Sequence, residues 1–234
     1  RLLKSRVSKI NSLGLFRNAI ACPEGAYTSE MKDEGLEVYP FEISRNLNFA
    51  RIGSELSSLR NVMRQFKPHI VHTHNSKVGV LGRIAAKRER VPLIIHQVHG
   101  FFFTALSGSK KRLYEMIERH FSKSADYILF QNMDEYKYAT ENGWNASASL
   151  VYIGNGIPTS EFRDHIRDVS SNARKCIICI ARIEPVKNHK YLLEALSMMR
   201  THYSELDFQL HLIGEYNEEG KRIILDFARN AHLT

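Results

Sequence analysis

Short apolar runs separated by amphipathic stretches recur along most of this chain, and they predict strands that alternate with helices. The clearest helix signal is an apolar stripe at three- and four-residue spacing, formed by Ile52, Leu56, Leu59, Met63 and Phe66. Pro68 follows and should end this helix, because proline cannot continue the backbone hydrogen-bond ladder. A strand is expected to begin directly after it.

The same patterns assign the remaining elements. Strands are expected over residues 18–22, 36–43, 69–74, 93–99, 127–130, 150–153, 176–181 and 208–213. Helices are expected over residues 1–14, 27–34, 52–66, 76–88, 109–123, 133–141, 188–199 and 218–231. Gly79 and Gly82 fall on one side of their helix, where close packing needs small residues. The alternation predicts an α/β fold of parallel βαβ units, with helices on both faces of each sheet.

The alternation breaks once, at the sequence Asn-Gly-Ile-Pro that begins at residue 155. We therefore predict a first domain over residues 1–157, a linker over 158–173 and a second domain over 174–234. The second domain has only two predicted strands, and a two-stranded parallel sheet leaves edges open and buries too little core. The chain also does not begin with Met. We expect a fragment in which both domains are incomplete.

Charge narrows the classes of partner. The formal net charge is +8, which favours phosphates, nucleic acid or an acidic membrane surface. The basic residues occur in short scattered clusters, and for any one cluster a solvated surface is the favoured account. No apolar run approaches the roughly 20 residues that span a bilayer, and no secretory signal opens the chain.

The three cysteines cannot form a complete disulfide framework, which fits a reducing, cytoplasmic compartment. Cys176 and Cys179 should point to opposite faces of one strand, because their spacing is odd. No second cysteine pair completes a zinc site. We interpret both as inert thiols.

Ligands of open parallel sheets bind beyond the carboxyl ends of the strands, so the strand ends supply the candidate site residues. His74 and His99 leave two separate strands at the same edge of the first predicted sheet. A zinc site would need three close ligands, often including a carboxylate, and none lies nearby in the sequence. His72 and His96 lie inside the strands, where packing or a hydrogen bond to the scaffold explains them. We expect no metal.

A second candidate lies where the strand over 176–181 runs into a helix. Arg182 leaves the strand, Lys187 precedes the helix, and Asn188 is a suitable N-cap. The two cations and the positive end of the helix dipole could together neutralise a diphosphate leaving group. A surface salt bridge between Arg182 and Glu184 is the competing explanation.

Three segments in this order resemble retaining GT-B glycosyltransferases of family 4, particularly those of bacterial exopolysaccharide and capsule synthesis. They are KPHIVHTHNSKVGVLGRIAAKRERVPLIIHQVHGFFF, VYIGNGIPTSEF and IARIEPVKNHKYLLEAL. The resemblance covers essentially the whole chain. It implies an acceptor-side domain followed by a nucleotide-sugar donor domain, both Rossmann-like and facing each other across a cleft.

The resemblance also implies roles for single residues. Arg182 and Lys187 would hold the donor diphosphate, and His99 would contact the transferred sugar or the reaction centre. Weaker candidates for substrate binding are His74, Asn75, Ser76, Lys77, Gly100, Asn155, Gly214 and Glu215.

The chain departs from the family pattern in several places. Ala181 replaces a glycine, Asn188-His189 replaces a Lys-Gly continuation, and GEYNEEG lacks a second glycine. The family's Gly-rich loop would precede Arg1, and its paired glutamates would follow Thr234. We expect this fragment to be inactive by itself.

The implied function is transfer of a sugar, with retention, from a nucleotide diphosphate sugar to an acceptor hydroxyl, without a cofactor. A UDP-sugar is the favoured donor and a lipid-linked saccharide at the cytoplasmic face of the plasma membrane the favoured acceptor. An epimerase of the same fold and a basic nucleic-acid-binding module are the alternatives. The second would need basic and aromatic residues interleaved on one exposed face, which we do not find, so no nucleic acid is expected.

Peripheral attachment to an acidic membrane surface would fit transfer to a lipid-linked acceptor. Lys110, Lys111 and Arg112 open a predicted helix and could contact anionic lipid. The inner stripe of that helix is expected to consist of Leu113, Met116, Ile117, His120 and Phe121.

Overall fold

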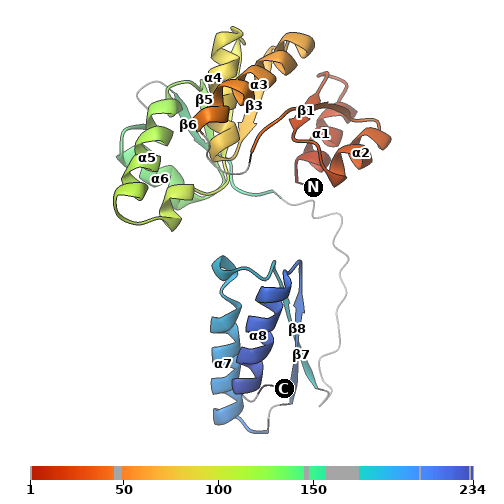
Figure 1. Ribbon diagram of the computed structural model, residues 1–234, viewed down its shortest axis with the longest axis vertical. Helices are drawn as coiled ribbons and strands as arrows, with labels where there is room; N and C mark the ends of the chain where they lie inside the picture. The colour runs from red at the N-terminus through yellow and green to blue at the C-terminus, as the bar shows by residue number, and fades with distance from the viewer. Residues whose placement is uncertain are drawn as a thin grey trace. The chain divides into compact units, whose positions relative to one another are not determined.

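The computed structural model describes residues 2–44, 49–144, 148–156, 174–205, 207–231 and 233. The chain divides into two compact units, Arg1–Thr159 and Ser160–Thr234 (Figure 1). The predicted linker over 158–173 lies outside the described residues. Each unit is a parallel α/β arrangement, as the alternating pattern predicted.

The first unit begins with a small layer of its own. It contains α1 (Leu2–Ser12), β1 (Ala19–Cys22), α2 (Ala26–Asp33) and β2 (Glu37–Pro40). β1 and β2 form a two-stranded parallel sheet that is separate from the main sheet.

The main sheet of the first unit has four parallel strands in the sequential order β3-β4-β5-β6. The elements are α3 (Ile52–Phe66), β3 (Ile70–His74), α4 (Ser76–Arg88), β4 (Leu93–Val98), α5 (Gly108–Ser122), β5 (Tyr127–Phe130), α6 (Met133–Glu141) and β6 (Ser149–Tyr152). Short 3-10 turns cover Phe49–Arg51 and Phe102–Ala105. Because neighbouring strands run parallel, their carboxyl ends meet at one edge, which sets the place of the candidate site.

The core of the first unit forms where the helices cover this sheet. Ile94, Ile128 and Phe130 are fully buried in the strands. The apolar stripe predicted for α3 packs into the same cluster through Leu56 and Leu59. This burial is what drives the alternating pattern into a sheet with packed helices, at about 25 cal/mol per Å² of apolar surface removed from water.

The two glycines of α4 lie against the sheet, as expected. A Cβ on Gly79 would stand 2.5 Å from Cε1 of His96, and one on Gly82 would stand 2.9 Å from Cγ2 of Thr73. Any larger residue would push α4 away from β3 and β4. The helix therefore approaches the sheet closely only because both positions are glycine.

The prediction for the inner face of α5 was wrong in part: Ile117 and Phe121 are partly buried, but the other three residues of the stripe are exposed. Leu113 and Met116 are exposed, and Glu118 and Ser122 are the buried residues. The reason is an ion pair: the fully buried Arg83 of α4 reaches the Glu118 carboxylate, with 3.3 Å between the charged atoms. A buried charge must keep its partner, so this pair constrains the rotation of α5 and leaves Leu113 and Met116 facing outward.

The second unit contains β7 (Lys175–Ile180), a 3-10 turn over Pro185–Lys187, α7 (His189–His202), β8 (Phe208–Ile213) and α8 (Glu218–Asn230). The two strands pair in parallel, from Lys175 with Phe208 to Ile180 with Ile213. Both helices lie on one side of this pair (Figure 1). Helices on both faces were predicted, so in the described part of this unit that prediction does not hold.

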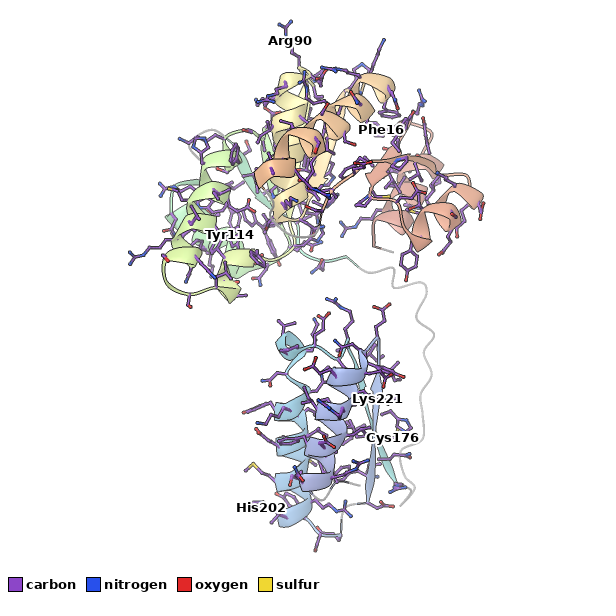
Figure 2. All side chains as sticks on the ribbon, in the orientation of Figure 1. Phe16, Arg90, Tyr114, Cys176, His202 and Lys221 are labelled. Carbon is purple, nitrogen blue, oxygen red and sulfur yellow. The ribbon has the colours of Figure 1, made fainter. Side chains whose placement is uncertain are left out.

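Side chains along β7 and β8 point alternately to the open face of the sheet and to the face that the helices cover. Ile178, Ile180 and Ile213 are half or more exposed, whereas Cys179 is partly buried. Cys176, labelled in Figure 2, is exposed. The two thiols are free and differ in burial, as the odd spacing predicted.

None of the helices in the described part of the chain combines the length and the apolar character that crossing a bilayer demands. Within the same ranges, no group of three or more histidine, cysteine, aspartate or glutamate side chains is placed to bind a metal ion.

Candidate functional site

Three neighbouring strand ends of the first unit bring His74, His99 and Gln131 into one hydrogen-bonded row. His74 is the last residue of β3, while His99 and Gln131 directly follow β4 and β5. His74 Nδ1 lies 2.9 Å from His99 Nε2, and His99 Nδ1 lies 3.0 Å from Gln131 Oε1. The expected meeting of the two histidines at this edge is therefore present. The central imidazole is bonded through both of its nitrogens.

A third ring extends the row. The rings of His72 and His74 are tilted by 33° with their centroids 4.3 Å apart, and the ring centroids of His74 and His99 lie 5.1 Å apart. Burial lowers the pKa of His74 to about 3, and nearby His72, His99 and Arg6 further oppose a positive charge there. Burial also lowers the pKa of His99, although its hydrogen bond to Gln131 acts in the opposite direction. Both rings are therefore neutral near pH 7.

Arg6 reaches this edge from α1. Its Nη1 donates to Oε1 of Gln97 over 3.2 Å. Gln97 lies in β4, is almost fully buried, and pairs in register with His74. This contact supplies a cation next to the neutral histidines.

The turn that carries His99 is held from α6. The backbone N–H of Phe101 donates to Glu135 Oε1 over 2.8 Å. Gly100, which lies between His99 and Phe101, has φ +122, a left-handed conformation that favours glycine. Phe101 then packs into the core against Phe103, with ring centroids 4.7 Å apart. Gly100 thus shapes the turn, and the turn places His99.

His96 belongs to the scaffold, as expected. Its ring is buried, and Nδ1 lies 2.9 Å from Oγ1 of Thr73 on the adjacent strand. Burial holds the pKa of His96 well below its ordinary value. The ring fills the space that Gly79 leaves on α4.

The residues after His74 have different surroundings. Asn75 has φ +63 and occupies the N-cap position of α4 without a side-chain capping bond. Ser76 hydrogen-bonds the Glu118 carboxylate. Lys77 Nζ donates to the Ser44 carbonyl and forms an ion pair with Glu55, both at 2.9 Å. Ser76 and Lys77 thus bond the scaffold, which leaves Asn75 as the exposed member of this set.

Asn155 lies beyond the carboxyl end of β6 and is exposed. It follows the fourth strand of the same sheet, so it shares the edge where the histidines meet. Its place follows from the strand order alone.

In the second unit, Arg182 lies two residues beyond the end of β7 and is exposed. Its Nη1 donates to Oε1 of Glu184 over 2.7 Å, and both side chains are solvent-accessible. The competing salt bridge is therefore formed in this structure. An exposed pair of this kind contributes about 0–1 kcal/mol to stability.

Lys187 is the last residue of the 3-10 turn and is exposed. Asn188 occupies the N-cap position of α7 in a left-handed conformation, with φ 49 and ψ 43, but its side chain makes no capping bond. The N-cap position of Asn188 was correctly predicted, but the expected capping hydrogen bond from its side chain is not formed. Lys187 precedes the first residue of α7 by two positions, at the end of the helix where the dipole is positive.

Gly214 has a structural reason to be glycine. A Cβ there would lie 2.2 Å from the carbonyl oxygen of Ala181, and its φ is +158. The backbone of Glu215 accepts a hydrogen bond from Ile183 N over 2.8 Å. The close approach of Gly214 and the hydrogen bond to Glu215 thus hold the turn that carries Arg182 against the end of β8.

Sequence reasoning missed Gln131, Glu135 and Arg6. Gln131 could have been found, since it follows a predicted strand and the strand-end rule applies to it. Glu135 and Arg6 lie on helices, and only the folded chain shows that they reach this edge. The histidine row and the Arg182–Lys187 segment belong to different units, and each is described by itself.

The family is decided by one comparison. Residues 12–156, more than half of the chain, match the glycosyl transferase 4-like domain. The chain belongs to this family. The matched range contains the whole histidine row and ends close to the last described residue of the first unit.

Among curated proteins, this glycosyl transferase 4-like chain is similar to an Escherichia coli UDP-Gal:alpha-D-GlcNAc-diphosphoundecaprenol alpha-1,3-galactosyltransferase. The identity is 27% over 188 residues, covering 76% of this chain and 48% of that protein. It is also 25% identical over 199 residues to a protein of the cps region of Klebsiella pneumoniae, covering 76% and 52%. The chain thus spans about half the length of these relatives.

Solved structures show the fold. A Rickettsia africae glycosyltransferase superposes with a TM-score of 0.69 at 18% identity, covering 98% of this chain and 61% of that one. Anabaena HepE in complex with UDP and glucose gives 0.66 at 14% identity, covering 90% and 57%. A UDP-N-acetylglucosamine 2-epimerase from Rickettsia bellii gives 0.56 at 18%, covering 90% and 58%. The predicted GT-B class of α/β fold is confirmed.

Proposed function

We propose that the protein containing this chain transfers a sugar from a UDP-sugar to a hydroxyl of a lipid-linked saccharide, with retention, in the synthesis of a cell-surface polysaccharide. The observation that carries the proposal is the glycosyl transferase 4-like match, which spans the strand ends that hold His74 and His99. The E. coli relative is named for this class of donor and acceptor, and the Klebsiella relative lies in a cps region.

His99 is assigned to the transferred sugar. It is exposed at the edge of a buried sheet, on a turn fixed by Glu135. A polar side chain held at such an edge can contact a ligand without reorganising the strands beneath it.

Arg182 and Lys187 are assigned to the donor diphosphate. Both are exposed cations at the junction of β7 and α7. Negative charge grows on a nucleotide diphosphate as the glycosidic bond breaks, so cations placed there stabilise the transition state more than the bound donor. The guanidinium of Arg182 would then exchange or share its present partner, Glu184.

An acidic membrane surface at the cytoplasmic face is the proposed location of the acceptor. Lys110, Lys111 and Arg112 are exposed at the start of α5, and the apolar Leu113 and Met116 are exposed beside them. Cations next to exposed apolar side chains suit the headgroup region, where each cation contributes about 1 kcal/mol and the apolar groups insert.

The membrane assignment is tested by vesicle flotation of the full-length protein. Replacing the three cations of α5 by Ala should release the protein from acidic liposomes. The matched control removes three exposed cations at the end of α4 and just beyond it, Lys87, Arg88 and Arg90, and should leave binding unchanged. Equal flotation of both variants and the parent would show that α5 is an ordinary solvated helix.

The transferase assignment is tested with the full-length protein, a panel of labelled UDP-sugars and a diphosphoundecaprenol-linked GlcNAc acceptor. We expect label in the lipid fraction and retention of the donor's anomeric configuration in the product. Conversion of the UDP-sugar into an isomer with water as the only acceptor would identify an epimerase instead. Steeply salt-dependent nucleic-acid binding without transfer would indicate the remaining alternative.

A further inference from the structure

We propose that His74 and Gln131 are positioning residues that fix the His99 imidazole as the tautomer with its proton on Nδ1, so that its Nε2 can only accept a hydrogen bond. The inference rests on the proposed sugar contact of His99. The inference adds the direction of the hydrogen bond in that contact: the group that His99 recognises must be a donor, such as a sugar hydroxyl.

The first step is the bond to Gln131. A carboxamide oxygen accepts and never donates, so His99 Nδ1, 3.0 Å from Gln131 Oε1, must carry the proton. A neutral imidazole has one N–H and one bare nitrogen. The bare nitrogen of His99 is therefore Nε2.

The second step is the bond to His74. Its Nδ1 lies 2.9 Å from the bare Nε2 of His99, so His74 must be the donor in this contact. The proton of His74 is thereby placed on Nδ1, and each ring determines the tautomer of the next. Two hydrogen bonds to one ring also fix the plane of that ring, which a single bond would leave free to rotate.

The surroundings make the arrangement rigid. The His74 ring lies beside that of His72, with centroids 4.3 Å apart, and the His74 backbone pairs with Gln97 in the sheet. Glu135 holds the peptide after Gly100. The three parallel strands β3, β4 and β5 thus deliver the three side chains at fixed spacing, and none of them depends on a ligand for its place.

The chemical consequence is selectivity. A hydroxyl that approaches Nε2 can donate its proton there, either in place of the His74 N–H or while that bond lengthens. A group that only accepts, such as an ether oxygen or a phosphate oxygen, has no proton to offer and cannot replace the His74 N–H at that nitrogen. The row therefore directs His99 toward the sugar side of a donor and away from its diphosphate.

The direct test is long-range ¹H–¹⁵N spectroscopy of the full 234-residue chain labelled on its histidines, at a pH above all histidine titrations. We expect His99 to show the Nδ1–H tautomer in the parent. In Gln131→Glu only oxygens can face Nδ1, so this variant should show the same tautomer. An Nε2–H tautomer in the parent that reverses in Gln131→Glu would mean that Gln131 turns its nitrogen to His99, and it would overturn the proposal.

The role of His74 is tested by two substitutions in the same spectra. His74→Phe keeps a ring beside His72 but removes the N–H that keeps Nε2 of His99 bare. The Gln131 amide can then rotate and present its nitrogen to Nδ1, so His99 should become a mixture of tautomers. His74→Asn retains an amide donor near the position of Nδ1, and should restore the single tautomer. His72→Phe, which removes a ring that makes no bond to His99 in this structure, is the control. One unchanged tautomer in His74→Phe would refute the role.

In the full-length enzyme, His74→Phe should lower kcat about three- to tenfold, the value of one hydrogen bond, with little change in the KM for donor. His74→Asn should recover most of it, and His72→Phe should match the parent. Because the spectra do not require turnover, the two ideas fail separately. The expected tautomers without any transfer would refute the proposed function alone, and transfer with mixed tautomers in the parent would refute the positioning alone.

Discussion

The two units hold their candidate residues in opposite ways. In the first, His99 is bonded on both sides by neutral groups, and its turn is tied to α6 through Glu135. In the second, Arg182 and Lys187 stand exposed at the end of a two-stranded sheet, and Arg182 is bonded only to its near neighbour Glu184 among the described residues. The difference is one of restraint: hydrogen bonds from neighbouring strand ends fix the orientation of the His99 ring, whereas the two cations of the second unit are solvated.

If the exposed cations bind the donor diphosphate, as proposed above, their removal should affect the reaction much more than stability. In the full-length protein, Arg182→Ala should reduce the transfer rate by about 10²–10³, as expected for loss of one group that stabilises developing negative charge. Arg182→Lys should not restore it, because the planar two-pronged donor is lost. The measurement is the transfer rate beside the melting temperature of the same variants.

Arg174→Ala is the matched control for Arg182. Arg174 is an exposed arginine of the same unit, paired with Asp207 at 2.9 Å, and its removal should leave turnover unchanged. If Arg182→Ala melts lower but transfers sugar at the parental rate, Arg182 is scaffold and the contrast between the units disappears.

The first unit should respond to changes behind its strand ends. Gly79→Ala should lower the free energy of unfolding by about 1–3 kcal/mol, because the new methyl group would overlap the His96 ring. Gly53→Ala is the control, since a Cβ on Gly53 in α3 meets nothing within 4 Å. That substitution should instead stabilise by about 1 kcal/mol through helix propensity. Chemical denaturation measures both, and equal effects would contradict the packing of α4 on β4.

Acid should weaken the first unit through its neutral histidines. The pKa of His74 is about 3 in the folded chain and 6.5 in a free histidine, so the unfolded chain binds a proton first as the pH falls. Above pH 6.5 the contribution of His74 to the free energy of unfolding is fully present. Below pH 6.5 this free energy should fall by about 1.4 kcal/mol per pH unit, until the pH reaches the pKa of His74 in the folded chain.

The acid effect is isolated by a variant. His74→Phe should flatten the dependence of unfolding free energy on pH between 6.5 and 5 relative to the parent. Carboxylates contribute equally to both proteins and cancel in the difference. Parallel curves would mean that folding does not lower the pKa of His74.

The smallest expected effect is that of Glu184. Removing its carboxylate breaks an exposed pair, so Glu184→Gln should change stability by at most about 1 kcal/mol. Donor affinity should be unchanged or slightly stronger, because Arg182 loses a competing partner. A large fall in melting temperature would show that the salt bridge organises the turn after β7.

Most of the secondary structure could be predicted from the sequence. The bounds of α4, β5, α6 and β8 agree with the predicted ranges, because strong periodicity and glycine, proline or asparagine at the ends leave few alternatives. The strand-end rule also placed His74 and His99 on one edge. The inner face of α5 could not be predicted, because periodicity cannot show that Arg83 will be buried and will require Glu118 opposite it.

By itself, the sequence determined the parallel α/β architecture, the order of its elements and the residues that stand at the strand ends, because these depend on local periodicity and on the direction of the chain. Only the tertiary structure decided which of those residues meet. Lys77 forms an ion pair with Glu55, and Arg182 forms one with Glu184. His99 is hydrogen-bonded to both His74 and Gln131. Such pairings depend on distances between strands and helices far apart in the chain, and on which polar groups lose water when those elements pack.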